Sequence, residues 1–187
     1  IISHNQGKLI DNLLSSFQNL DYTNFQFIIT INIPEDLSFL EKYSKFSIEL
    51  IENDFVKGFG ENHNYAFSQS NSQFFAVLNP DTQVNLLDIS HIIEFFKKNP
   101  STGALTVKCF NKNGIEQDHV RNFPNLLVNF LRFLNLYNKD NVYVDRIQKI
   151  DWASGAFLIF PEKSFKRVGG FDENFFLYFE DVDICRR

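Results

Sequence analysis

The stretch Phe74-Phe-Ala-Val-Leu-Asn-Pro-Asp-Thr82 decides the fold of this chain. Its apolar run reaches Leu78 without a polar residue, and Asn79-Pro80 then ends the run at a turn. An uninterrupted apolar run of this length is typical of a strand that is buried on both faces. Such strands occur mainly in parallel sheets that helices cover on both sides. The stretch therefore predicts an α/β domain.

The same alternation of strand and helix extends to both sides of this stretch. Apolar runs predict strands at residues 25–31, 47–51, 105–110 and 152–160, and residues 1–5 read as the tail of a strand entering a loop. Amphipathic spacing predicts helices at residues 10–17 and 89–98. We also expect helices at residues 37–43, 61–70, 124–136 and 162–168, and a further helix from residue 180. We therefore expect a Rossmann-like, mainly parallel central sheet flanked by helices, with ligands at the carboxyl ends of the strands.

The composition and charge of the chain exclude several classes of protein. Its 187 residues fit one domain with a sizeable core, and no repeat or linker divides residues 1–187. The net charge of -5, without a basic run, argues against nucleic-acid binding, because phosphate neutralisation needs clustered Lys and Arg. Cys109 and Cys185 form no CxxC pair, which favours reduced thiols in the cytoplasm. No apolar stretch approaches the roughly 18 residues needed to span a bilayer.

Both ends of the chain look trimmed. It opens on Ile1 rather than Met, and it ends at Arg187 without a helix stop signal. We therefore expect a domain that is truncated at both ends.

A carboxylate directly follows the predicted strand at residues 74–78. Asp81, in the turn Asn79-Pro80-Asp81-Thr82, stands where a strand of an α/β sheet presents side chains to a ligand. Mg²⁺ takes only one or two protein carboxylates and completes its shell with phosphate oxygens and water. Asp81 alone would therefore suffice for a metal shared with a diphosphate. The simpler alternative is a turn and helix cap.

A glycine-rich loop precedes the helix predicted at residues 61–70. It runs from Asn53 to Asn64 and contains Gly58-Phe59-Gly60. The glycines would allow close backbone approach to a ligand, and a helix N-terminus favours an anionic group. The loop is neither a Walker motif nor a dinucleotide fingerprint, because it lacks a third glycine and a GK[ST] sequence. A tight structural loop is the alternative, with His63 as a hydrogen-bonded structural residue rather than a metal ligand.

Acidic residues crowd the C-terminal segment, and they are Asp172, Glu173, Glu180, Asp181 and Asp183. A helix that starts near residue 180 needs one acid for capping, whereas three are present. Glu180 and Asp183 would share a helical face, which leaves Asp181 free to act as a base in a cleft.

Aromatic residues surround these carboxylates, and they are Phe175, Phe176, Tyr178 and Phe179. We expect them to bury the region and to raise a carboxyl pKa towards the working range of a general base.

Taken together and in this order, the motifs resemble those of family 2 glycosyltransferases. They are similar to the rhamnosyltransferase-like branch that builds bacterial surface polysaccharides. The resemblance spans nearly the whole chain. The residues that carry it are Ser3-His4-Asn5, Asn53, Gly58 to Asn64, Leu78 to Thr82, Ser154 to Phe157, Gly169 to Asp183 and Arg186.

The resemblance implies a glycosyltransferase A fold and an inverting transfer of a sugar. The donor would be a nucleotide-diphosphate sugar, and the acceptor a saccharide or lipid-linked saccharide. Asp81 falls at the family's DxD-type metal motif and would bind Mg²⁺ or Mn²⁺ on the diphosphate. Asp181 matches the family's general base. The enzyme would act in the cytoplasm, with peripheral association at the inner face of the membrane as a further expectation.

The resemblance also assigns residues to the two substrates. Residues 1–85 would form the nucleotide-sugar part and residues 86–187 the acceptor and catalytic part. Donor contacts would come from Ser3, Asn5, Asn53, Gly58, Phe59, Gly60, Asn64 and Asn79. Sugar and acceptor contacts would come from Trp152, Ser154, Gly155, Ala156, Asp172, Glu173 and Glu180.

One position departs from the family pattern. Many members have an Asp-Asn pair after the second strand, whose Asp helps to read the nucleotide base. Here no Asp precedes Asn32 in the segment Ile29-Thr30-Ile31-Asn32. Base recognition is then left to Thr30 or Asn32, and the identity of the donor stays open.

The chemistry of inversion fits this set of residues. It needs a base on the acceptor hydroxyl and positive charge on the departing diphosphate, and no protein nucleophile. No Ser-His-Asp or Cys-His signature is recognisable. Three alternatives stay open: a degenerate transferase domain that binds a nucleotide or glycan without turnover, a hydrolase with two carboxylates, and a structural domain whose acids only cap helices.

Overall fold

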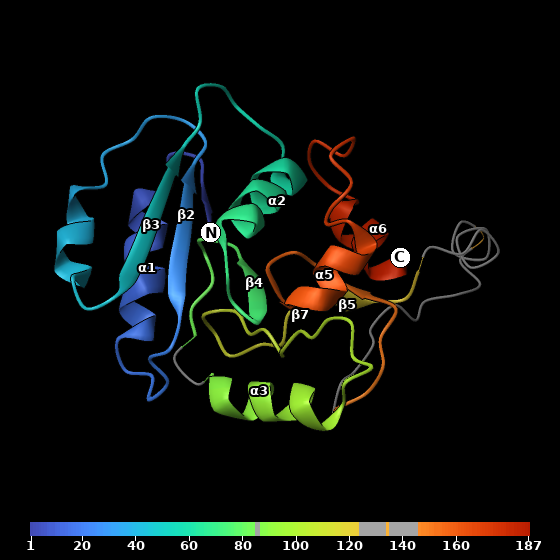
Figure 1. Ribbon diagram of the computed structural model, residues 1–187. Helices are drawn as coiled ribbons and strands as arrows, with labels where there is room; N and C mark the ends of the chain where they lie inside the picture. Colours follow the sequence, from blue (N-terminus) through green and yellow to red (C-terminus); the bar gives the residue numbers. More distant parts are fainter. Residues whose placement is uncertain (85–86, 124–133, 135–145) are drawn as a thin grey trace.

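The computed structural model describes residues 1–84, 87–123, 134 and 146–187. Strands and helices alternate along the chain, as predicted (Figure 1). In chain order the elements are β1 (Ile2–Ser3), α1 (Gly7–Phe17), β2 (Gln26–Ile31), the 3₁₀ helix η1 (Ser38–Tyr43), β3 (Ser47–Glu52), α2 (Phe59–Gln69), β4 (Phe74–Leu78), α3 (Ile89–Lys98), β5 (Val120–Arg121), β6 (Trp152–Ala153), β7 (Phe157–Pro161), α5 (Glu162–Val168) and α6 (Glu180–Arg186).

The strands pair in two main groups. β1, β2 and β3 form a parallel sheet, in which Gln26–Ile31 lies in register with Ser47–Glu52. β4 pairs with β7, which runs antiparallel to it, so that Leu78 lies opposite Phe157. A short antiparallel pair of β5 and β6 adds a third group.

Successive side chains of β2 point to opposite faces of the sheet, and the core accordingly forms two clusters. Phe27 and Ile29 of β2 pack with the buried face of α1, whereas Ile28, on the opposite face of the strand, packs with the cluster that contains Ala66 of α2. α1 buries its apolar residues at helical spacing, as predicted. Figure 1 shows α2 between the β1–β3 sheet and the C-terminal helices α5 and α6. This central position lets α2 contact both parts of the chain.

Two predicted strands are wrong in part. Residues 105–110 form only isolated bridges, from Leu105 to Ile159 and from Phe110 to Glu116. Residues 152–160 form two strands instead of one, because the Gly155 N–H turns out of the sheet towards Asp181.

The predicted helices differ from the structure by small amounts. α2 begins at Phe59, earlier than predicted, and residues 38–43 form a 3₁₀ rather than an α-helix. The helix predicted at residues 124–136 lies outside the described residues apart from 134. In the described parts of the chain, no helix is long and apolar enough to cross a membrane.

Candidate active site

The turn that carries Asp81 is fixed by hydrogen bonds to Ala156. The N–H of Asn79 (3.0 Å) and the hydroxyl of Thr82 (3.2 Å) both donate to the Ala156 carbonyl. Within the turn, the Thr82 N–H donates to the Asn79 carbonyl at 3.1 Å. Pro80 is buried, whereas Asp81 is exposed. A fixed backbone thus presents the Asp81 carboxylate to solvent.

Asp181 contacts Gly155, the residue that precedes Ala156 in the sequence. Its Oδ2 accepts the N–H of Gly155 at 3.2 Å, and its Oδ1 accepts the N–H of Val182 at 2.8 Å. Gly155 and Ala156 are adjacent in sequence, so one short piece of backbone bonds both the turn that carries Asp81 and the Asp181 carboxylate. The break between β6 and β7 therefore brings together two motifs that lie a hundred residues apart.

Glu180 is the carboxylate that the fold buries. It is 5% exposed, and its Oε2 has no hydrogen-bond partner among the described residues. Burial raises the pKa of Glu180, and the charge of Asp181 adds to this shift. The raised pKa in this segment thus belongs to the residue that precedes the predicted base.

The prediction that aromatic residues bury this segment is wrong except for Phe175, which is half-buried. Residues 176–179 are all exposed. The chain enters α6 through left-handed backbone at Tyr178 (φ 69°) and Phe179 (φ 71°), and the first side chain that turns inward is Glu180. Left-handed backbone is unfavourable for residues other than glycine, and functional sites are where it is most often found.

The glycine-rich loop makes its close approach to the protein's own C-terminal segment. The N–H of Phe59 donates to the Phe176 carbonyl at 2.9 Å. A Cβ on Gly58 would lie 2.8 Å from that carbonyl oxygen, and one on Gly60 would lie 2.8 Å from the Cβ of Phe171. The glycines are therefore needed for packing.

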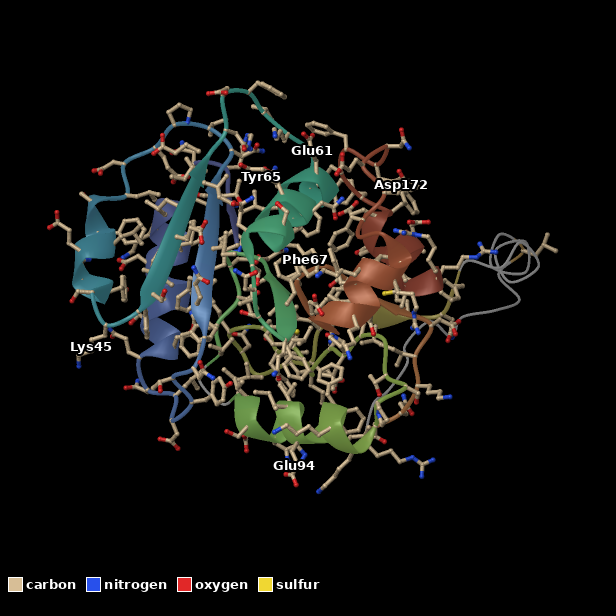
Figure 2. The ribbon with its side chains drawn as sticks, in the orientation of Figure 1. Lys45, Glu61, Tyr65, Phe67, Glu94 and Asp172 are labelled. Carbon is tan, nitrogen blue, oxygen red and sulfur yellow. The ribbon has the colours of Figure 1, made fainter. Side chains whose placement is uncertain are left out.

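Asn64 joins α2 to the same segment. Its Oδ1 accepts the Phe171 N–H at 2.8 Å, and its Nδ2 donates to the Phe171 carbonyl and to Oε1 of Glu173, both at 2.9 Å. Figure 2 shows Glu61 at the start of α2 beside the segment that carries Asp172. The predicted donor loop and the predicted acceptor segment thus form one structural unit.

Three asparagine side chains form an amide cluster at the ends of β2 and β3, in which Asn32 and Asn62 are buried and Asn53 is half-buried. Asn53 donates to Oδ1 of Asn32 (2.9 Å) and to Oδ1 of Asn62 (2.7 Å), and Asn32 also bonds both backbone groups of Lys57. Asn62 was missed by sequence reasoning, and its only signal is that it is one of several asparagines in the loop. Thr30 is buried too, and its Oγ1 has no hydrogen-bond partner within the described residues. Asn32 therefore holds the backbone at Lys57, and Asn53 holds the side chain of Asn32.

The other predicted site residues differ in how far their side chains are buried. Ser3 is buried, and Asn5 is exposed with left-handed backbone (φ 59°). Trp152 is half-buried, and its indole N–H donates to the Asn122 carbonyl at 3.0 Å. Asp172 is half-buried and caps the turn that follows it.

His63, expected to be a hydrogen-bonded structural residue, is buried among aromatic rings. It is buried against the rings of Phe59 and Phe171, and its Nε2 has no partner in the part of the chain that the structure describes. Burial holds the pKa of His63 well below its ordinary value, so the ring is neutral.

Asp81 can bind a metal ion only if a bound substrate supplies further oxygen ligands to the ion. Among residues 1–84, 87–123, 134 and 146–187, no three His, Cys, Asp or Glu side chains are grouped to hold a metal. A single exposed carboxylate fits a cation whose other ligands are diphosphate oxygens and water. The apolar cavity of about 780 Å³ between β2, β4 and α3 is lined by other residues.

The comparison with known proteins identifies the family and the fold. The sequence model described as Glycosyl transferase family 2 matches residues 1–168, which include the Asp81 turn and the Gly155 break. The chain belongs to glycosyl transferase family 2. The transferase is 28% identical to rhamnosyltransferase WbbL of Escherichia coli (strain K12), across 100% of this chain and 74% of WbbL.

A second relative is the N-acetylglucosaminyl-diphospho-decaprenol L-rhamnosyltransferase of Mycobacterium tuberculosis. It is 27% identical to this transferase, across 59% of this chain and 39% of the mycobacterial protein. The mannosyltransferase PcManGT from Pyrobaculum calidifontis, solved in complex with GDP-Man and Mn²⁺, superposes with a TM-score of 0.67 at 15% identity. That match covers 98% of this chain and 48% of PcManGT, and it confirms the predicted glycosyltransferase A fold. The transferase thus spans about half of the solved relative.

Gly155→Ala is expected to destabilise the transferase at the break between β6 and β7. The new Cβ would lie 2.9 Å from Cζ of Phe59, whose ring packs against His63 and Phe171. Overpacking of this kind costs about 1–3 kcal/mol, which urea denaturation measures. The matched control is Gly103→Ala, where nothing lies within 4 Å of the new Cβ. Equal losses in the two variants would contradict the tight packing of Gly155.

His119 also contacts the backbone at the break between β6 and β7. Its carbonyl accepts the Ser154 N–H at 2.8 Å. Its Nδ1 lies 3.0 Å from the Gln117 carbonyl and its Nε2 lies 2.7 Å from the Val107 carbonyl. Carbonyls only accept, so both nitrogens donate and the ring is a cation. The Cys109 side chain and these carbonyls raise the pKa of His119 to about 9, against the opposing effect of burial.

The stability of the transferase is therefore expected to depend on His119 in alkaline solution. The folded pKa is raised above the ordinary value of 6.5, so the stabilisation is complete below 6.5 and is lost as the pH rises through about 9. The loss is about 3 kcal/mol, since each unit of pKa shift corresponds to about 1.4 kcal/mol. Urea denaturation across this range should show it in the wild type and not in His119→Gln. Identical pH profiles for the two proteins would show that His119 is not a cation.

Proposed function

We propose that the transferase moves a hexosyl or rhamnosyl group, with inversion, from a nucleotide-diphosphate donor to a saccharide or lipid-linked saccharide acceptor. The observation that supports this most is the anchoring of the Asp81 turn and Asp181 to adjacent residues, Ala156 and Gly155. The names of the two rhamnosyltransferase relatives support the class of sugar. The reaction would take place in the cytoplasm, at the inner face of the membrane when the acceptor carries a lipid.

Asp181 is the proposed general base. Its carboxylate takes the proton from the acceptor hydroxyl as the oxygen attacks the anomeric carbon and the bond to the diphosphate breaks. The N–H groups of Gly155 and Val182 orient the carboxylate for this step. Burial raises the pKa of the neighbouring Glu180, and the charge of Asp181 adds to this shift.

Asp81 is the proposed ligand of Mg²⁺ or Mn²⁺ on the donor side. When bound, such an ion neutralises the charge that develops on the leaving diphosphate. The Mn²⁺ and GDP-Man in the structure of PcManGT support this assignment. Residues 1–85 would bind the donor and residues 86–187 the acceptor. The exposed Asn5 would touch the nucleotide, while the buried Ser3, Thr30 and Asn32 and the half-buried Asn53 would lie behind it.

A thermal-shift screen of nucleotide-diphosphate sugars with Mn²⁺ tests this function. A donor present at 100 times its Kd should stabilise the protein by about 2.7 kcal/mol, and EDTA should remove the effect. If no uridine, guanosine or thymidine diphosphate sugar shifts the transition, the proposed donor class is wrong.

A binding module without turnover is the second candidate. It is favoured by the burial of Thr30 and Asn32, which removes from the surface the two side chains left to read a nucleotide base. A coupled assay for nucleoside diphosphate, run with donor and acceptor together, separates the two candidates. Release that depends on the acceptor excludes the binding module.

A further inference from the structure

Exposed apolar side chains gather next to the proposed base. Two loops supply them, and we call their six residues the aromatic rim: Phe55, Val56, Phe176, Leu177, Tyr178 and Phe179. Their exposed fractions run from 44% for Val56 to 72% for Tyr178. The hydrogen bond from Phe59 to the Phe176 carbonyl, and the close contact of Gly58 with the same carbonyl, hold the two loops together.

The aromatic rim is unusual for a surface exposed to water. Apolar residues that are exposed singly are normal, whereas contiguous apolar surface marks a site of interaction. Four rim residues are consecutive, and two of them, Tyr178 and Phe179, have left-handed backbone. A strained backbone that keeps apolar side chains in water points to a ligand that covers them.

The aromatic rim continues directly into the start of α6. The Phe179 carbonyl accepts the N–H of Asp183 in the first turn of that helix, and Asp181 lies two residues after Phe179. The aromatic rim and the proposed base are therefore neighbours along the chain.

A positive charge borders the aromatic rim. The Nζ of Lys57 lies 5.5 Å from the ring centroid of Phe55 and 5.4 Å from that of Tyr65, and it pairs with Glu61 at 3.3 Å. A cation beside apolar side chains is complementary to a diphosphate that carries a hydrocarbon chain. The charge of the whole chain is -5, which opposes docking on an anionic bilayer.

We propose that the aromatic rim binds the hydrocarbon chain of a lipid-linked acceptor, with the acceptor sugar at Asp181 and the linking diphosphate near Lys57. This inference rests on the proposed function. The mycobacterial relative is named for an acceptor of this chemistry, a sugar joined through a diphosphate to decaprenol. The aromatic rim gives the hydrocarbon part of such an acceptor a place to bind outside the bilayer.

The test uses farnesyl diphosphate as a probe and inorganic diphosphate as the same headgroup without a chain. Both are titrated calorimetrically in EDTA, so that a metal-bound diphosphate does not contribute. The wild type should bind farnesyl diphosphate more tightly than diphosphate, and the double variant Phe55→Ser/Leu177→Ser should lose at least about tenfold in affinity for the farnesyl probe. The control Phe110→Ser/Ile115→Ser changes two residues that are also exposed but lie in another turn, and it should bind like the wild type.

Three results would overturn the inference. The first is equal farnesyl diphosphate affinity in the rim variant and the control variant. The second is retention of the wild type on phosphatidylcholine vesicles that contain no isoprenoid diphosphate, which would make the rim a bilayer-docking surface. The third is a dimer in solution that the rim variant abolishes, which would make it an interface between two copies of the chain.

The failure of this inference differs from the failure of the proposed function. If a nucleotide sugar binds with Mn²⁺ while the rim variant keeps its affinity for farnesyl diphosphate, only the assignment of the rim is wrong. If the rim variant loses the farnesyl probe and no nucleotide sugar binds the wild type, only the proposed transfer is wrong.

Discussion

Asp181→Asn is expected to remove sugar transfer and to leave donor binding intact. The amide cannot take up the proton of the acceptor hydroxyl, and the loss of a general base typically costs about 10²–10⁴ in rate. The Asn oxygen still accepts the Gly155 N–H, so the break between β6 and β7 keeps its geometry. The kcat for release of nucleoside diphosphate should fall by this factor, while the Kd of the donor from calorimetry should change by less than about twofold.

The matched control for this variant is Asp183→Asn. It makes the same chemical change on the same helix, at a carboxylate that pairs with Arg187 at 2.7 Å. A surface ion pair of this kind is worth about 1 kcal/mol or less, so the control should keep its kcat within about twofold. Transfer at the wild-type rate by Asp181→Asn, or an equal loss in both variants, would contradict the assignment of the base.

Asp81→Ala is expected to make donor binding independent of the metal. In the wild type, Mn²⁺ should tighten the binding of the nucleoside diphosphate by at least about tenfold relative to EDTA, because the ion bridges Asp81 and the diphosphate. In the variant the two conditions should give the same weak affinity. Calorimetry with and without Mn²⁺ measures both proteins directly.

The control for the metal site is Asp21→Ala, at an exposed carboxylate between α1 and β2. It should show the full effect of Mn²⁺, since Asp21 lies outside the turn after β4. The turn itself should survive the loss of the Asp81 side chain, because its hydrogen bonds run through the Asn79 backbone and the Thr82 hydroxyl. Persistence of the Mn²⁺ effect in Asp81→Ala would move the metal to other ligands.

The elements that could be predicted are those whose sequence pattern lies within a short stretch of consecutive residues. The spacing of Ile10, Leu13 and Leu14 indicates α1, because a helix buries residues three and four apart, and all three are fully buried. The apolar run of β4 indicates a buried strand for a similar reason. The Asp81 turn could also be predicted, since a proline turn after a buried strand leaves few other conformations open.

Other features depend on contacts between distant residues, and their sequences carry no local sign of them. The break at Gly155 arises from the Asp181 carboxylate and the Phe59 ring, both distant in sequence. The exposed aromatic residues before α6 read as core by composition, and only the left-handed backbone at Tyr178 and Phe179 turns them outwards. The antiparallel direction of β7 is likewise set by its pairing with β4, which is distant in sequence.

The most direct test of the central claim is the anomeric configuration of the first-formed product, measured by proton NMR with a donor of known configuration. A single displacement, with Asp181 as the base and the diphosphate as the leaving group, predicts the configuration opposite to that of the donor. A product that retains the donor configuration could not arise from a single in-line displacement. That result would contradict the roles proposed for Asp181 and Asp81.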